Sequence, residues 1–430
     1  MFSFFYNCIL FLIGLVALPQ LLWQWLRYGK YRATLSQRLG LNLSKLPSQK
    51  KGKVFWIHAC SLGETKAAVP LYNLMRQSYP EATFVISNTT ETGHAEAKKS
   101  MPQASTHFFL PLDFSFQVKK VVERVQPDLL ILIESDFWYH LLHYAKKAGA
   151  KIALVNGKMS ERSAKRFALF SFFARRLFSH FDCLCVQNAT YKEVFLRFDI
   201  PSTKLHVTGN IKFDHLPPTL TQEQLALHKK ELGILPTDRV VVIGSTHDRE
   251  EEWLLSALDK VWQKIPQLKV LLVPRHPERF PLVAACLQSR GLSHISYTQR
   301  SQMRGDERVV LIDTMGFLNK AYQLGEVAIV GGSFVDGIGG HNVFEPAACG
   351  VPVLFGPYMA DQAPIVDLVL KAKAGMQLTL DALAQTLLEL LEHPEQQLPL
   401  RNAGLRLAQE AQGATLRSWQ AIQKILETKD

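Results

Sequence analysis

The sequence predicts an α/β protein with two Rossmann-like domains that face each other across a cleft, preceded by an apolar helix. Short apolar runs alternate with amphipathic segments from Val54 onward, which is typical of a parallel sheet covered by helices on both faces. The alternation stops at Pro217 and Pro218 and then starts again. The residues before Leu26 are almost all apolar.

The first half of the chain contains five predicted strands and three predicted helices. The strands are expected at Val54–His58, Thr83–Ser87, Asp128–Glu134, Lys151–Asn156 and Cys183–Gln187. The helices are expected at Glu64–Ser78, Phe137–Lys147 and Arg162–His180. We place the first Rossmann-like domain at residues 31–214.

A linker is expected at Phe213–Thr219, because adjacent prolines disfavour regular structure. The second domain, residues 215–430, repeats the α/β pattern. Its strands are expected at Val240–Gly244, Lys269–Val273, Arg308–Asp313, Val327–Gly331 and Val351–Phe355. Its helices are expected at Asp248–Lys264, Pro277–Arg290, Val343–Cys349 and Leu380–Glu392.

Residues 1–30 are interpreted as a membrane anchor. The segment Phe2–Trp25 carries no charge and is long enough to cross a bilayer as a helix. Trp23, Trp25 and Tyr28 lie at its end, and basic residues follow, which places the remainder of the chain in the cytoplasm by the positive-inside rule. A cleaved signal peptide is disfavoured, because a basic n-region and a small-residue cleavage site are lacking. A helix that lies in the membrane interface remains an alternative.

The chain is basic, with a formal charge of +11, and 47% of its residues are hydrophobic. No acidic residue precedes Glu64, whereas basic residues are frequent there: Arg27, Lys30, Arg32, Arg38, Lys45, Lys50, Lys51 and Lys53. This distribution favours an anionic membrane surface as a partner over nucleic acid, with a solubilising linker as the alternative. The six cysteines show no zinc-like spacing and are interpreted as reduced thiols of a cytoplasmic protein.

The first candidate site lies where a predicted strand meets a helix, at Ser61–Glu64. Gly63 is expected to allow a tight turn and the close approach of a ligand. Glu64 lies in the first helical turn, where the helix dipole favours a carboxylate that could act as a general base. A helix-capping role for Glu64 is the alternative.

Two further polar clusters follow predicted strands in the first half. Glu134 and Asp136 end a very apolar strand, and we assign Asp136 to the cap of the next helix and Glu134 to the site. Lys158 and Arg162 would add positive charge that faces an anionic substrate.

In the second half, several strand ends carry residues suited to a nucleotide. Ser245 and Thr246 offer backbone N–H groups, and Arg275, followed by His276, offers a guanidinium for a phosphate. A glycine-rich loop with Gly340 and Asn342 leads into a helix that bears Glu345, a candidate for the ribose hydroxyls. No P-loop, GxSxG or DxD motif occurs, so NTPases, α/β-hydrolases and metal-dependent sugar transferases are disfavoured.

Taken in series, these motifs resemble the bacterial 3-deoxy-D-manno-octulosonic acid (Kdo) transferases. The matching segments are Ser61–Glu64, Asn156–Ser163, Gly209–Asp214, Gly244–His247, Pro274–Phe280, Asp313–Gly316 and Gly331–Pro346. Their order and spacing match over essentially the whole chain. Departures from the family pattern occur at Asp136, Tyr139, His140, Lys158 and Phe317.

The resemblance implies a GT-B fold and an inverting transfer of Kdo from CMP-Kdo to a lipid A precursor at the inner membrane, without a metal cofactor. It implies that Glu64 is the catalytic base and that Glu134 or Asp136 is a second functional acid. The implied CMP-binding residues are Arg275, Met315, Gly316, Asn342 and Glu345, and Ser245, Thr246, His276 and Gly340 are added from the motifs beside them. Ser61, Gly63, Lys158, Arg162 and Lys212 are expected at the acceptor. A GT-B enzyme that uses a UDP-sugar, or a membrane-tethered nucleotide-sugar-binding protein, is the alternative.

Overall fold

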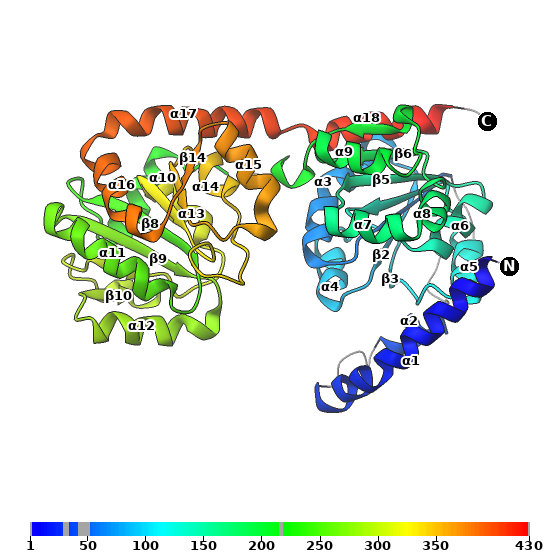
Figure 1. The fold of residues 1–430 in the computed structure, drawn as a ribbon, viewed down its shortest axis with the longest axis horizontal. Helices are drawn as coiled ribbons and strands as arrows, with labels where there is room; N and C mark the ends of the chain where they lie inside the picture. The colour runs from blue at the N-terminus through cyan, green and yellow to red at the C-terminus, as the bar shows by residue number, and fades with distance from the viewer. Residues whose placement is uncertain (1, 29–33, 42–51, 215–217, 429–430) are drawn as a thin grey trace. The chain divides into compact units, whose positions relative to one another are not determined.

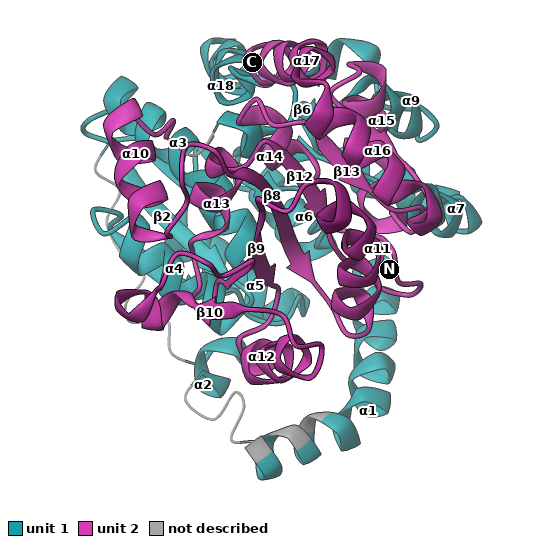
Figure 2. Cartoon of the chain, turned by 90° about the vertical axis from the view of Figure 1, so that its left-hand side faces the viewer, with its two compact units in different colours: residues 1–215, 412–430 teal, residues 216–411 magenta. Residues whose placement is uncertain are grey.

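The computed structural model describes residues 2–28, 34–41, 52–214 and 218–428. The chain divides into two compact units (Figures 1 and 2). Unit 1 comprises Met1–His215 and Gln412–Asp430, and unit 2 comprises Leu216–Ala411. Each unit is a parallel sheet with helices on its faces, as the sequence predicts.

Unit 1 contains a seven-stranded parallel sheet in the order β3-β2-β1-β4-β5-β6-β7. The strands are β1 (Val54–His58), β2 (Thr83–Asn88), β3 (Thr106–Phe109), β4 (Leu129–Ile133), β5 (Lys151–Gly157), β6 (Cys183–Val186) and β7 (Leu205–Val207). The sequence did not predict β3 and β7, which are edge strands of three or four residues.

The helices of unit 1 are α1 (Phe2–Tyr28), α2 (Leu35–Arg38), α3 (Leu62–Ser78), α4 (Glu91–Ser100), α5 (Ser115–Val125), α6 (Tyr139–Lys147), α7 (Glu161–Leu169), α8 (Ser171–Phe178), α9 (Ala189–Leu196) and α18 (Ala414–Glu427). The prediction of one helix over Arg162–His180 is wrong. The backbone of Phe170 leaves the helical region at φ −120° and ψ 51°, so α7 ends there and α8 begins.

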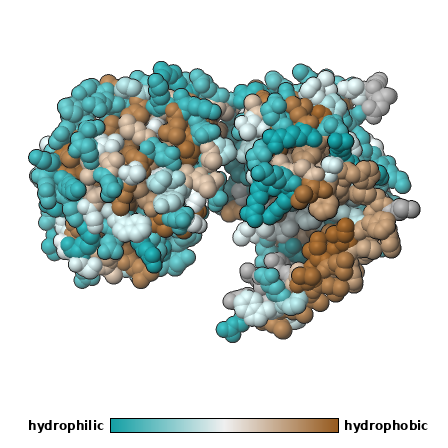
Figure 3. Space-filling model, viewed as in Figure 1, coloured by the Kyte–Doolittle hydropathy of each residue, from teal (hydrophilic) through white to brown (hydrophobic). Residues whose placement is uncertain are grey.

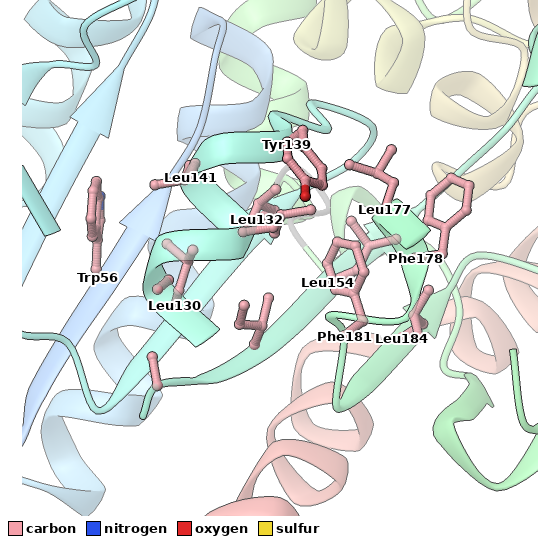
Figure 4. Close-up of a cluster of buried hydrophobic side chains, with 14 of the residues drawn as sticks. Trp56, Leu130, Leu132, Tyr139, Leu141, Leu154, Leu177, Phe178, Phe181 and Leu184 are labelled. Carbon is pink, nitrogen blue, oxygen red and sulfur yellow. The ribbon is translucent and has the colours of Figure 1, made fainter. Parts of the chain in front are cut away.

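Successive residues of the central strands enter two different hydrophobic cores, one on each face of the sheet. Trp56, Leu130 and Leu132 belong to the core under α6 and α8 (Figure 4), whereas Phe55, Leu129 and Ile131 belong to the opposite core. Because both faces are covered, these strands appear in the sequence as continuous apolar runs rather than alternating ones.

Unit 2 has a second seven-stranded parallel sheet, in the order β10-β11-β9-β8-β12-β13-β14. Its strands are β8 (Arg239–Thr246), β9 (Leu268–Pro274), β10 (His294–Ser296), β11 (Val309–Leu311), β12 (Val327–Val330), β13 (Val353–Phe355) and β14 (Gly375–Gln377). Its helices are α10 (Gln222–Glu231), α11 (Glu250–Lys264), α12 (Phe280–Ser289), α13 (Leu318–Leu324), α14 (Phe344–Ala348), α15 (Ala363–Lys371), α16 (Leu380–Glu392) and α17 (Pro394–Ala411).

The C-terminal helix departs from the expectation that residues 215–430 form one domain, because α18 packs on unit 1. The carboxylate of Asp214 accepts hydrogen bonds from the first backbone N–H groups of this helix, at 2.7 Å from Gly413 N and 2.6 Å from Thr415 N. Trp419 of α18 is buried in a core of unit 1. Of the predicted linker, residues 215–217 lie outside the described residues.

The apolar helix α1 is continuous through Pro19, and its segment Phe2–Gln20 is long and apolar enough to cross a membrane, by length and composition alone. Of the expected basic stretch, Lys30, Arg32, Lys45, Lys50 and Lys51 lie outside the described residues. The guanidinium of Arg38 donates to the carbonyl of Thr89 at 2.6 Å, so this side chain is engaged within unit 1.

Candidate active site

The sheet of unit 1 has its topological switch point between β1 and β4, which are neighbours although the chain continues from β1 to β2 on the other side. Loops that follow strands at such a point are the usual ligand-binding position in open α/β sheets. Glu64 follows β1, and Glu134 and Asp136 follow β4. The structure therefore brings the three predicted acids to one edge of unit 1.

Glu64 lies in the first turn of α3, as predicted, and its carboxylate turns back to the loop before the helix. Oε2 accepts the backbone N–H of Cys60 at 2.7 Å, and the Ser61 hydroxyl lies 3.3 Å from Oε1. Ser61 is the N-cap of α3. Burial is the main cause that raises the pKa of Glu64, and the nearby charges of Glu134 and Asp136 raise it further. A carboxylate with a raised pKa is a stronger base than an ordinary glutamate.

Asp136 does not cap the next helix, so that prediction is wrong. Helix α6 begins at Tyr139, and Asp113 takes the capping role, accepting the N–H groups of His140 at 2.9 Å and Leu141 at 3.0 Å. The carboxylate of Asp136 instead lies 3.0 Å from Nε2 of the fully buried His58. Burial raises the pKa of Asp136, but the hydrogen bond from His58 is the strongest of the interactions that oppose it, and the pKa stays below its usual value.

His58 is oriented by a chain of buried hydrogen bonds. The indole N–H of Trp56 donates to the Ser87 hydroxyl at 2.7 Å, and the same hydroxyl lies 2.8 Å from Nδ1 of His58. With Ser87 donating to Nδ1, the Nε2–H group of His58 points to Asp136. This arrangement keeps Asp136 as an ionised carboxylate beside Glu64.

Glu134 is buried between two lysines, Lys158 and Lys212, which contact its two carboxylate oxygens. Burial alone would raise its pKa, but the two ammonium groups lower it below the usual value. Its backbone has a positive φ of 68°, which is unusual for a residue with a side chain and typical of functional loops. The geometry makes Glu134 an ion-pair partner that positions Lys158 and Lys212, two of the predicted acceptor residues.

The other predicted acceptor residues lie apart from this ion-pair cluster. Gly63 is helical within α3, so the prediction of a tight turn there is wrong. A Cβ added at Gly63 would meet no atom within 4 Å, so there is room for a ligand beside it. Arg162 is exposed in the first turn of α7.

Unit 2 has its own switch point, between β8 and β12. A cavity of about 350 Å³ opens beside it. Its lining includes Ser245, Arg275, Met315, Gly316, Asn342 and Glu345, all predicted for the donor. Ser245 has a positive φ of 60°, so the end of β8 repeats the backbone feature seen at Glu134.

The remaining predicted donor residues do not line this cavity. Thr246 is buried, and its hydroxyl donates to Glu251 at 2.8 Å. Gly340 packs against Met359, whose sulfur would lie 2.2 Å from an added Cβ, so its role is close packing with a positive φ of 80°. The ring of His276 stands beside that of His247, with centroids 5.3 Å apart.

Asn342 and Glu345 form one polar unit in the cavity, with Nδ2 of Asn342 donating to Glu345 at 3.1 Å. Burial is the main cause that raises the pKa of Glu345. The first N–H of α14, from Phe344, already donates to the Asn342 side chain at 3.0 Å. The N-terminus of α14 therefore has fewer free N–H groups for an anion than the sequence suggested. Arg275 is the main positive charge in the lining of the cavity.

Glu250 was not predicted from the sequence, and its carboxylate connects the loops that follow β8 and β12 at the switch point of unit 2. Its fully buried carboxylate accepts backbone N–H groups from Gly332 at 2.7 Å, Ser333 at 3.1 Å, Phe334 at 3.0 Å and His247 at 3.1 Å. An acid at the start of an amphipathic helix looks like an ordinary surface residue in the sequence. His341, which also lines the cavity 2.7 Å from His247, was missed as well.

A family model described as "3-Deoxy-D-manno-octulosonic-acid transferase (kdotransferase)" matches residues 33–215. The 3-deoxy-D-manno-octulosonic acid transferase of Chlamydophila psittaci is 33% identical over 99% of this chain and 96% of the relative. The crystal structure of the C-terminal CMP-Kdo binding domain of WaaA from Acinetobacter baumannii is 31% identical, covers 44% of this chain and 97% of that one, and has a TM-score of 0.41.

The UDP-GlcNAc 2-epimerase from Neisseria meningitidis covers 87% of this chain and 100% of its own, with a TM-score of 0.61 and 14% identity. At that identity the likeness shows the fold alone, which is of the GT-B type. The near full-length match to the chlamydial relative decides the family. The chain belongs to the 3-deoxy-D-manno-octulosonic acid transferases, which are glycosyltransferases.

Proposed function

We propose that this chain is an inverting glycosyltransferase that moves Kdo from CMP-Kdo to a lipid A precursor at the cytoplasmic face of the inner membrane. The observation that supports it most is the acid cluster at the switch point of unit 1, where Glu64 lies beside Asp136 and Glu134. Membership of the Kdo transferases supports the sugar, and the cavity of unit 2 supports a nucleotide donor.

In this proposal the CMP part of the donor occupies the cavity of unit 2. The guanidinium of Arg275 pairs with the phosphate and stabilises the charge that develops as CMP leaves. Asn342 and Glu345 hydrogen bond to the ribose hydroxyls, since together they offer a donor and acceptors within one polar unit. Charge stabilisation by Arg275 lets the reaction proceed without a metal cofactor.

Glu64 acts on the acceptor. Its carboxylate takes the proton of the acceptor hydroxyl while that oxygen forms a bond to the anomeric carbon of Kdo. The bond between this carbon and the phosphate oxygen breaks, and CMP leaves with the electron pair. Attack opposite to the leaving group inverts the anomeric centre.

Lys158 and Lys212 contribute the positive charge for the acceptor. A lipid A precursor carries phosphates, and both lysine side chains are about two-fifths exposed although each contacts Glu134. Glu134 therefore holds the two cations in place without neutralising them fully. The reaction requires the anomeric carbon of Kdo to reach the acceptor hydroxyl beside Glu64.

A transfer assay with purified full-length protein tests the proposal. CMP-Kdo and a tetra-acylated lipid A precursor are supplied, and the products are counted by mass spectrometry. Addition of one or more Kdo residues supports the proposal, and the same assay shows how many are added. Transfer from a UDP-sugar with none from CMP-Kdo, or binding of the nucleotide sugar without any transfer, contradicts it.

A further inference from the structure

We infer that α1 is a monotopic anchor: it lies along one face of the membrane, with both of its ends on the side occupied by unit 1, and does not cross the bilayer. This mode of membrane attachment is independent of which sugar is transferred. It follows from where the two ends of α1 are attached.

The first turns of α1 are bonded to the globular part of unit 1. Asn7 donates to the hydroxyl of Ser115 at 2.8 Å, and the backbone N–H of Ser115 donates to Asn7 at 3.1 Å. The ring of Phe2 lies 4.7 Å from that of Tyr139. Tyr6 shares a hydrogen bond with the buried carboxyl of Asp113, which also caps α6.

The chain that follows α1 returns to the same place. The carbonyl of Leu39 accepts a hydrogen bond from the side chain of Gln117 at 2.9 Å, and the carbonyl of Arg38 accepts one from Leu112 N at 3.0 Å. Ser115, which binds the start of α1, and Gln117 are both in the first turn of α5. The start of α1, at Asn7, and the chain after α1, at Leu39, therefore both bind the first turn of α5, two residues apart.

The connection between α1 and the attached residues after it is too short to let α1 cross a bilayer while both attachments are kept. Six Cα steps separate Tyr28 from Thr34, and they span at most about 20 Å when extended. The hydrocarbon core of a bilayer is about 30 Å thick. A spanning α1 would carry Asn7 and Phe2 to the opposite face, away from Ser115 and Tyr139, and would leave the Asp113 carboxyl without Tyr6.

The remaining surface of α1 requires an apolar partner, and its composition identifies that partner as lipid. Over Phe2–Gln20 the mean hydropathy is 2.0 and none of the segment is buried. In the face that Figure 3 shows, most of this helix is coloured as hydrophobic. Leu12 and Val16 are 60% and 84% exposed, and Arg27 lies in the last turn, suited to anionic headgroups.

An in-plane membrane helix normally keeps one polar face toward water. In α1 the more polar positions Ser3, Tyr6 and Asn7 form one stripe, and all three are partly covered. Unit 1 thus contacts the polar side of α1, which would face water in an isolated interfacial helix. The apolar remainder faces outward, as embedding in one leaflet requires.

A second exposed apolar element continues the surface of α1. Leu169, Phe170 and Phe172 at the junction of α7 and α8 are 80%, 70% and 71% exposed. The Phe172 ring lies 6.2 Å from that of Phe2 at the start of α1. The junction would enter the same leaflet as α1, with the exposed Lys165 and Arg166 at its edge.

Protease accessibility of the full-length protein tests the topology. An epitope tag is placed before Met1, and spheroplasts and inverted inner-membrane vesicles are treated with protease. We expect the tag to be lost only in inverted vesicles, together with unit 1. Loss of the tag in intact spheroplasts would mean that α1 spans the membrane and would overturn the inference.

Disulfide trapping tests the attachment itself in the membrane. We expect Asn7→Cys with Ser115→Cys, in a Cys8→Ser background, to form the 7–115 disulfide on mild oxidation, detected by mass spectrometry of peptides. The matched pair Val16→Cys with Ser115→Cys, more than two turns further along α1, should not link. Equal linking of both pairs, or linking of neither, would contradict the inference.

Flotation with vesicles that contain phosphatidylglycerol tests the lipid partner. Leu12→Glu with Val16→Glu should reduce the floated fraction at least tenfold. Leu398→Glu with Leu416→Glu, which changes two exposed leucines of α17 and α18, should leave it unchanged. Unaltered flotation of the α1 variant would exclude α1 as the membrane contact.

Discussion

His58 holds Asp136 at the edge of the sheet, with its Nε2 3.0 Å from a carboxylate oxygen of Asp136 and its ring fully buried. The Ser87 hydroxyl on the other ring nitrogen, 2.8 Å away, fixes which nitrogen faces Asp136. Asp136 in turn contributes to the raised pKa of Glu64. In the proposed mechanism, His58 is therefore a positioning residue that acts on Glu64 through Asp136.

We expect His58→Asn to lower kcat by roughly 10–100-fold, because a hydrogen bond to a charged group contributes about 1.5–3 kcal/mol. Asp136→Asn should give a similar loss, and the double variant should be no worse than either, since residues that act as a unit are not additive. The acid limb of the kcat profile should shift to lower pH in Asp136→Asn. Additive losses, or an unchanged pH profile, would mean a merely structural role. His107→Asn, a partly buried histidine on β3, is the control.

Arg275→Lys should raise the KM for CMP-Kdo by about tenfold or more with a smaller change in acceptor KM. Lysine keeps the charge but loses the planar pair of donors that matches a phosphate. Steady-state kinetics with each substrate varied measures the effect. Arg300→Lys, an exposed arginine outside the donor cavity, should change neither constant. Equal effects of the two substitutions would place the phosphate elsewhere.

Glu250→Gln should lower the free energy of unfolding of unit 2 by about 2 kcal/mol or more, because an amide cannot accept all four backbone N–H groups that the carboxylate accepts. Urea denaturation followed by tryptophan fluorescence measures it. Glu252→Gln on the exposed side of the same helix is the matched control and should change stability little. A similar, small effect of both would show that Glu250 does not organise the loop.

The ion pairs of Glu134 should make the free energy of unfolding depend on pH in a specific way. Lys212 and Lys158 hold its folded pKa below the ordinary value of 4.5. The folded state therefore binds fewer protons at this group than the unfolded state, so the stability it contributes is present above pH 4.5 and is lost as the pH falls through the folded pKa. Glu134→Gln should be less stable than the parent at pH 7, and the difference should shrink below pH 4.5. A difference that grows on acidification would contradict this. The substitution Glu123→Gln, at an exposed position of α5, is the control and should change the stability at pH 7 little.

Much of the architecture could be predicted because long buried parallel strands leave continuous apolar runs, as in β1, β4 and β8. Short edge strands such as β7 leave no such signal. The hydrogen bonds between Asp214 and the start of α18 could not be predicted either, because they join residues about 200 positions apart.

At the site, the positions of Glu64, Glu134 and Arg275 could be predicted from the rule that strand ends gather ligand-binding residues. Their partners could not. The choice of Asp113 rather than Asp136 as the cap of α6 depends on the path of the loop after β3, and the buried contacts of Glu250 depend on the glycine loop after β12. These are tertiary facts with no local sequence pattern.

The central claim, that Glu64 is the base, is tested most directly by Glu64→Gln assayed for both transfer and donor binding. We expect kcat to fall by about 10²–10⁴-fold, the usual contribution of a general base, with the Kd for CMP-Kdo unchanged within twofold. Glu91→Gln, which changes the exposed first-turn glutamate of α4, should behave like the parent. The acid limb of the parent enzyme should lie at higher pH than an ordinary glutamate gives, because the pKa of Glu64 is raised. Near-normal transfer by Glu64→Gln would contradict the account.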